Sequence, residues 1–500
     1  MAGTLGRGPQ SLSATHLGIL ALAATALLAG LPATGSAQDT TAVSVPGARD
    51  TTQADSTRLS FPRKHPVMAV LMATGVNVFV NRFDEWVLKV HDPIDGYFAR
   101  VTPDSWRANI RKGWVWDGDN FSVNMFMHPN QGAAYFRAGR ANGLNFWEST
   151  PLTFLGSLEW EYFGETTFPS LNDLYNTSFG GIVLGEATWR LAPLVRNNRA
   201  RGLRRLLGEL AAIPLDPTGS VKRLLRGDVW RNYPNPRGSY PGAFGFQLQA
   251  GGQVDKFSAI IGKRPVAAAF LGEMSYGDAF VTPYSQPFDV FTARVRGSTT
   301  GANIREVRVA GRLFARELTD TASIFRHIFT VTQKLEYEAN PAYKYGGQSM
   351  NVGFVSQLGT PRGFNVQTAL YAEGIMLGAV DAPRAGIAGT PRTYDFGPGV
   401  GFDLAAKFRL WGFPILTARW HGLYVHSVSG SPADHYIQFP SVEVAVPLTR
   451  KFGIGGYGGW FHRRSTYTNG LPGETMSAPE FRVYLVLNTE VGPVKPEPKP

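Results

Sequence analysis

Between Trp114 and Arg190 the chain gathers the polar residues best suited to chemistry. A histidine, an asparagine, an arginine and several carboxylates stand there among aromatic residues and glycines. Imidazole and carboxylate groups in one domain can transfer protons, and the same groups can hold a cation. The candidate site residues are His128, Asn124, Glu161, Glu165, Asp173, Glu186 and Arg190.

A structural interpretation stands beside the chemical one. His128 precedes a proline at a predicted helix break, where a histidine is more often a cap or a packing residue. Glu161 and Glu165 are four residues apart, and like charges at that spacing on a helix repel each other. They must face water, share a cation or proton, or be paired with arginines, and an ion-paired network requires the fewest assumptions. Its basic members would be Arg137, Arg140 and Arg190.

Known catalytic and cofactor motifs do not match. The histidine spacing fits neither HExxH nor a facial triad, and no glycine loop is suited to phosphate. The chain has no cysteine, which excludes thiolate nucleophiles and cysteine-held metal centres. Ser170 lacks a GxSxG turn and is better placed as the N-cap of a helix, with Asp173 as its capping partner. We therefore expect no cofactor and no metal.

Helices must position these residues. An apolar pattern at spacings of three and four predicts a helix over 64–90, followed by helices near 120–127, 132–142, 150–163 and 170–191. His128-Pro129 is expected to interrupt the second and third. In the last helix, Gly181 and Gly185 allow another backbone to approach closely, and Glu186 and Arg190 are spaced for an ion pair. Residues 64–195 form the expected α-helical domain.

The same region resembles an uncharacterised bacterial family, the domain of unknown function 3943, over about residues 65–190. The resemblance rests on polar and glycine positions, namely Asn124, His128-Pro129, Gly132, Tyr135, Arg140, Ser157, Trp160-Glu161, Glu165, Pro169-Ser170, Asp173, Gly180-Gly181, Gly185-Glu186 and Arg190. It implies a bacterial envelope protein and marks these residues for testing, but it implies no particular activity.

From Phe244 onward the hydrophobic period changes to two. Phe329 and Val331 alternate with Thr330 and Thr332, and similar segments recur between turns rich in glycine and proline. About a dozen such segments over 241–491 predict an antiparallel transmembrane β-barrel of roughly 12 strands, with apolar side chains facing lipid. A soluble β-sandwich would alternate too, but the number of strands favours the barrel. The expected fold class is α+β, with the helical domain preceding the barrel.

The remaining segments concern export and the membrane. Residues 1–37 read as a cleavable signal peptide, 38–63 as a disordered linker and 492–500 as a Pro/Lys tail. Residues 196–240 form a basic amphipathic segment that either lies on a membrane surface or closes the helical domain. Because the net charge of +11 is concentrated there, it indicates lipid headgroups rather than nucleic acid. The expected location is the outer membrane of a Gram-negative envelope.

Two functions are compatible with these patterns. In the first, the protein has a structural or transport role, and the helices are packed in or against the lumen as a plug. In the second, it is an enzyme that acts on an envelope lipid, or on a small molecule, through the polar residues of the helical domain. A plug should show every carboxylate paired with a basic residue. An enzyme should show a lipid-accessible cleft in which His128 and at least one unpaired carboxylate converge within hydrogen-bond reach.

Overall fold

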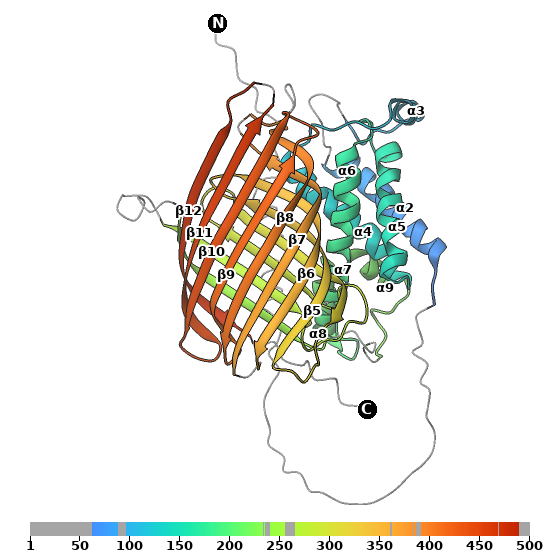
Figure 1. Ribbon diagram of the computed structural model, residues 1–500. Helices are drawn as coiled ribbons and strands as arrows, with labels where there is room; N and C mark the ends of the chain where they lie inside the picture. The colour runs from blue at the N-terminus through green and yellow to red at the C-terminus, as the bar shows by residue number, and fades with distance from the viewer. Residues whose placement is uncertain are drawn as a thin grey trace, which may run out of the picture.

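The computed structural model describes residues 63–88, 97–233, 235, 241–255, 266–360, 363–382, 384–386, 392–468 and 470–489. A closed barrel of antiparallel strands occupies the C-terminal part, and helices of the N-terminal part pack along one side of it (Figure 1). The predicted α+β class is confirmed, and so is the strand number. The expected signal peptide and the Pro/Lys tail lie outside the described residues, as does the linker apart from residue 63.

Each strand pairs with its neighbours in the sequence, and β1 closes the ring against β12. The strands are β1 (Phe244–Val254), β2 (Ala267–Tyr276), β3 (Phe291–Ser298), β4 (Ile304–Glu317), β5 (Phe325–Ala339), β6 (Lys344–Gly359), β7 (Phe364–Asp381), β8 (Tyr394–Leu410), β9 (Phe413–His426), β10 (Ala433–Pro447), β11 (Phe452–Tyr467) and β12 (Glu474–Asn488). On β10, Val442, Val444 and Val446 are exposed outward, whereas Glu443 points inward. An even-stranded closed barrel with an apolar outer surface is the architecture of outer-membrane proteins.

The two ends of the barrel differ in their turns. At the end where β1 begins and β12 ends, the β2–β3 loop has 14 residues, but three of the five turns have four residues or fewer, and only Trp411 and Gly412 join β8 to β9. At the opposite end, twelve residues separate Asp381 from Tyr394 between β7 and β8. Outer-membrane barrels carry their short turns on the periplasmic side. We therefore call the end with the Trp411-Gly412 turn the periplasmic end.

The lumen is filled by the barrel's own side chains. Across its middle, Arg294 on β3 reaches Glu443 on β10 at 3.2 Å, and Arg296 on β3 reaches Glu480 on β12 at 2.9 Å. Towards the extracellular end an apolar cluster follows, in which the rings of Phe439 and Phe461 stack with centroids 4.5 Å apart. A cavity remains at the periplasmic end of the lumen.

The helical part combines α-helices with single π-helical turns. The α-helices are α2 (Pro66–Phe83), α3 (Pro103–Lys112), α4 (His128–Ala141), α5 (Phe146–Glu159), α6 (Leu171–Tyr175), α7 (Gly181–Val195), α8 (Gly202–Ala212) and α9 (Pro217–Leu225). The π-helical turns are η1 (Asp84–Leu88), η2 (Val123–Met127), η3 (Trp160–Gly164) and η4 (Asn176–Gly180). His128-Pro129 does not interrupt the helical run as expected, because η2 continues directly into α4 and Pro129 is accommodated where the wider π-helical turn passes into the α-helix. The α3 helix was not predicted.

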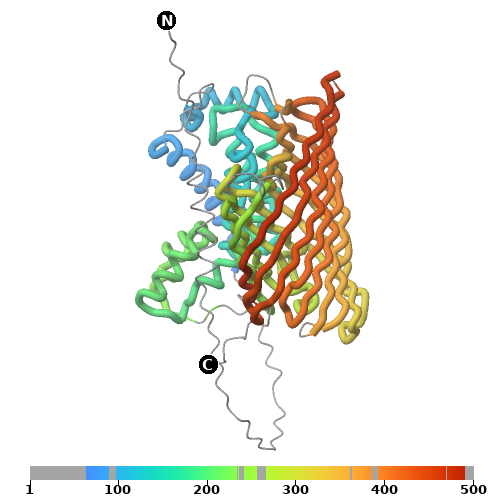
Figure 2. The backbone as a smooth tube through the Cα atoms, turned by 90° about the vertical axis from the view of Figure 1, so that its left-hand side faces the viewer, coloured from blue at the N-terminus to red at the C-terminus, as the bar shows by residue number. Residues whose placement is uncertain are grey.

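The helices lie on the outer wall of the barrel, not in the lumen (Figures 1 and 2). Along β5, Gln333 donates to the carbonyl of Phe179, Leu335 joins the cluster with α4 and α7, and Tyr337 packs on Phe121. The alternate residues of β5, Lys334, Glu336 and Glu338, carry ion pairs of the lumen. Since successive side chains of a strand point to opposite faces, the helices and the lumen are on opposite sides. Of the two arrangements expected, packing in the lumen is therefore not the one found.

Close backbone contact holds α4 and α7 together. A Cβ on Gly181 would lie 2.4 Å from the carbonyl carbon of Gly132. A Cβ on Gly185 would lie 2.7 Å from the Cβ of Phe136. The predicted role of these glycines is confirmed. The apolar residues of β4 and β5 that were expected to face lipid, such as Val309 and Leu335, instead cover this helix pair.

Away from the barrel, the helical domain exposes apolar side chains. Val67, Phe79 and Trp86 stand outward on α2 and η1, and Pro66–Leu88 is long and apolar enough to cross a membrane by length and composition. On α8, Leu203 and Leu207 are exposed, while Arg205 is buried against Glu209 at 3.0 Å. The basic segment thus combines an outward apolar face with an internal ion-pair network.

Candidate functional site

Three short segments bring most of the predicted residues together. Asn124 lies on η2 and His128 at the start of α4, one turn later. Glu161 lies on η3. Asp173 lies in the first turn of α6, where the Ser170 hydroxyl accepts from its backbone N–H at 3.3 Å, so that the predicted N-cap is confirmed. We call Asp117, Asn124, His128, Glu161, Asn172, Asp173 and Asn176 the polar cluster.

Asn172 is the centre of the polar cluster. Its amide nitrogen lies 2.8 Å from Asp117 Oδ1, 3.0 Å from Asn124 Oδ1 and 3.0 Å from Asp173 Oδ1. An amide nitrogen carries two hydrogens, so it cannot satisfy three acceptors fully. Asn124 Oδ1 also accepts from the amide of Asn176 at 3.2 Å. The cluster is therefore rich in oxygen acceptors and short of donors.

His128 faces one of these carboxylates. Its Nε2 lies 3.2 Å from Asp173 Oδ1, and both side chains are buried. Neither ring nitrogen makes a hydrogen bond of good geometry within the described residues. Burial lowers the pKa of His128 from 6.5 to about 4, although Asp117 opposes the shift. The ring is therefore neutral at physiological pH, with a nitrogen available to accept a proton.

Glu161, Glu165 and Asp173 make no ion pair with arginine or lysine among the described residues. Glu161 is 1% exposed, and its Oε2 accepts from the backbone N–H of Ser170 at 2.7 Å while Oε1 has no partner there. Burial raises the pKa of Glu161 and of Asp173, and repulsion from Glu165 and Asp117 adds to it. Burial also raises the pKa of Glu165 to about 8. Burial therefore favours the protonated form of all three carboxyl groups, and they do not form the expected ion-paired network.

The barrel wall closes the polar cluster from the other side. The Asn124 amide donates to the Tyr394 hydroxyl at 2.8 Å, and Gln348 on β6 donates to Asn176 Oδ1 at 3.1 Å. Arg392 donates to the backbone carbonyl of Asp117 at 3.1 Å. The site thus lies between helices and strands near the extracellular end of the barrel.

Glu186 and Arg190 do not belong to this site. Glu186 is bonded by Arg190 at 2.7 Å and by Arg140 at 2.9 Å, so the predicted ion pair is confirmed. Arg190 also donates to the carbonyl of Pro287, in the loop between β2 and β3. Arg137 donates to Thr188 and to the carbonyl of Leu215. Arg190 thus ties α7 to the barrel, whereas Arg137 and Arg140 tie α4 to α7, and none of them compensates the carboxylates of the polar cluster.

A second group of potential metal ligands lies in the lumen. Glu336, Glu373 and His421 converge there, the only such set of three among the described residues. Lys334 Nζ lies 2.8 Å from Glu336 and 2.9 Å from Glu373, and Arg308 also pairs with Glu336. Since these cations neutralise the carboxylates, the group is an ion-pair network and does not fit a metal centre.

Sequence reasoning missed Asp117, Asn172 and Asn176. Asp117 belongs to the short polar run Asp117–Asn120, which could have indicated it. Nothing in the sequence distinguishes Asn172 and Asn176 from other polar residues near the start of a helix. Only the tertiary structure shows that both side chains face the polar cluster.

One family model matches part of the helical region. Residues 113–218 match the family described as "Domain of unknown function (DUF3943)". This confirms the resemblance seen in the sequence, and the match covers the whole polar cluster. No curated protein matches the chain.

Solved outer-membrane barrels are similar in outline only. The outer membrane protease OmpT of Escherichia coli is 9% identical, covers 50% of this chain and 97% of its own, and gives a TM-score of 0.18. OmpT of Vibrio cholerae is 11% identical, with coverages of 49% and 96% and a TM-score of 0.17. The protein opdK of Pseudomonas aeruginosa is 9% identical, with coverages of 49% and 98% and a TM-score of 0.18. Scores this low establish no correspondence of residues or of function.

Proposed function

We propose that this protein is an outer-membrane enzyme that performs acid–base chemistry on an envelope lipid. The observation that carries the proposal is the buried His128–Asp173 contact of 3.2 Å, set among carboxylates without basic partners. A neutral imidazole can take a proton from water, and a carboxyl of raised pKa can give one to a leaving group. Hydrolysis of an ester needs both steps.

The position of the site favours a lipid over a soluble substrate. The polar cluster lies on the outer side of the barrel wall, and the helices that cover it expose apolar residues such as Phe79 and Trp86. A lipid could diffuse to such a surface laterally. Because His128 is buried, turnover also requires a movement of the side chains that cover it.

The test is a hydrolysis assay on the full chain in liposomes made from extracted envelope lipids, with products followed by mass spectrometry. His128→Ala and Asp173→Asn should each reduce turnover by about 10²–10⁴-fold, as loss of a general base does. His426→Ala is the matched control, because His426 also contacts an aspartate, Asp434, at 2.8 Å but is exposed on β9. Full turnover in His128→Ala, or none in the wild type, would overturn the proposal.

A structural role is the second candidate, and the filled lumen favours it over transport. The ion pairs that cross the lumen and the apolar cluster above them leave little room for a solute to pass. Under this proposal the helical domain would stabilise the barrel wall from outside. The protein would then tolerate His128→Ala with no loss of any activity.

A further inference from the structure

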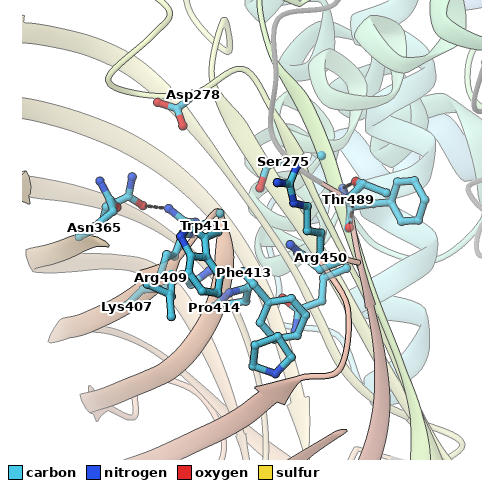
Figure 3. Close-up of a pocket in the computed structure, with 18 of the residues that line it drawn as sticks. Ser275, Asp278, Asn365, Lys407, Arg409, Trp411, Phe413, Pro414, Arg450 and Thr489 are labelled. Carbon is cyan, nitrogen blue, oxygen red and sulfur yellow. Dashed lines mark hydrogen bonds between the residues drawn. The ribbon is translucent and has the colours of Figure 1, made fainter. Parts of the chain in front are cut away.

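The cavity at the periplasmic end of the lumen is separate from the polar cluster. It has a volume of about 1220 Å³, and its walls come from strand ends and from the connections β2–β3, β6–β7, β8–β9 and β10–β11, with Asp278, Trp411 and Arg450 among the lining residues (Figure 3). We call it the vestibule. It is large enough for a ligand of small-molecule size.

Cationic side chains outnumber acidic ones in the wall of the vestibule, where Lys407, Arg409 and Arg450 accompany Glu273 and Asp278, both of which attract Arg409. Glu273 is bonded by Arg294 at 2.8 Å and contacts Lys407 at 3.4 Å. The Asp278 carboxylate accepts from the backbone N–H groups of Phe280 and Val281. The acids of the wall are therefore engaged by other groups.

Two guanidinium groups remain. Arg409 donates to the neutral side chain of Gln367, which in turn donates to Gln357 at 3.0 Å and is thereby held in place. Arg450 is exposed in the turn between β10 and β11 and makes no ion pair among the described residues. Both guanidinium groups line the vestibule, and the arginine fork is suited to oxyanions.

An apolar surface accompanies these cations. Trp411 and Phe413 line the same cavity (Figure 3). Trp411 adopts a left-handed backbone conformation with φ 52°, which is unfavourable for a bulky side chain. The two-residue hairpin turn Trp411-Gly412 requires positive φ at both positions, and Gly412 has φ 81°, so the turn accounts for this conformation.

We propose that the vestibule binds an anionic amphiphile from the periplasmic side. Its oxyanion is held by Arg409 and Arg450, and its apolar part lies on Trp411 and Phe413. This proposal is independent of the chemistry suggested for the polar cluster.

Calorimetric titration of the full chain in a nonionic detergent tests the proposal with three probes. Dihexanoyl phosphatidate carries the anion and the apolar part, inorganic phosphate carries only the anion, and dihexanoyl phosphatidylcholine carries a zwitterionic headgroup. Phosphatidate should bind at least about tenfold more tightly than either of the others, because charge-assisted bonds and apolar contact both contribute. Equal binding of phosphate would exclude the amphiphile, and equal binding of phosphatidylcholine would exclude recognition of charge.

Two variants tie the binding to the arginines. Arg409→Gln and Arg450→Gln should each weaken phosphatidate binding by about tenfold, the loss expected for one charge-assisted contact. Arg450 lies in an exposed turn, so its replacement leaves the fold intact even if Arg409→Gln does not fold. Arg464→Gln is the control, because Arg464 is an exposed arginine near the opposite end of β11. Unchanged affinity in Arg450→Gln, or an equal loss in Arg464→Gln, would overturn the assignment.

Discussion

At the scale of single residues, the carboxylates of the helical domain fall into two kinds. Glu186 is buried with two arginines around it, so it is charged and structural. Glu161 and Asp173 are also buried, and neither pairs with an arginine or lysine among the described residues. Burial without a counter-charge favours the protonated form. Acid–base capacity is therefore concentrated at the polar cluster.

The raised pKa of Glu165 makes stability depend on pH. Because the folded chain keeps a proton that the unfolded chain loses, its stabilising contribution is complete below the ordinary pKa of 4.5 and is lost as pH rises through about 8. Glu165→Gln removes this titration. Relative to the wild type, the variant should gain thermal stability between pH 5 and pH 8.5, as followed by helical circular dichroism. A difference that does not change with pH would contradict the assigned shift.

At the scale of elements, the sequence predicted those features that depend on local period. Alternation with period two revealed the barrel strands, because each strand needs only its own residues to present an apolar face. It could not tell whether that face meets lipid or helix, since Leu335 is equally suited to both. For the same reason the sequence did not predict the hydrogen bond between Asn124 and Tyr394, which are 270 residues apart in the chain.

The contact of α4 with α7 gives a prediction for glycine. Gly181→Ala places a Cβ against the backbone of Gly132, so it should destabilise the helical domain by roughly 1–3 kcal/mol. Gly75→Ala is the matched control, because no atom within 4 Å would meet its Cβ on α2. That variant should be neutral or stabilise the helix by about 0.5–1 kcal/mol. Chemical denaturation in detergent measures both, and equal effects would argue against tight α4–α7 packing.

At the scale of the whole molecule, the lumen and the helical domain are structurally separate. The helices cover strands of one wall from outside (Figure 1). Ion pairs and aromatic rings fill the lumen. Closure of the barrel therefore does not depend on the helices. The polar cluster is buried between the helices and the outer wall of the barrel, whereas the vestibule lies at the periplasmic end of the lumen.

Closure by the barrel's own side chains predicts the behaviour in planar bilayers. The wild type should show no stable conductance, because Arg296 and its three carboxylate partners cross the middle of the lumen and Phe439 and Phe461 pack above them. Replacing both phenylalanines by alanine removes the stacked rings and should produce intermittent current steps. His426→Ala, exposed on β9, should remain closed. A steady open current in the wild type would mean that these side chains move aside in the membrane, and a transport role would then be favoured.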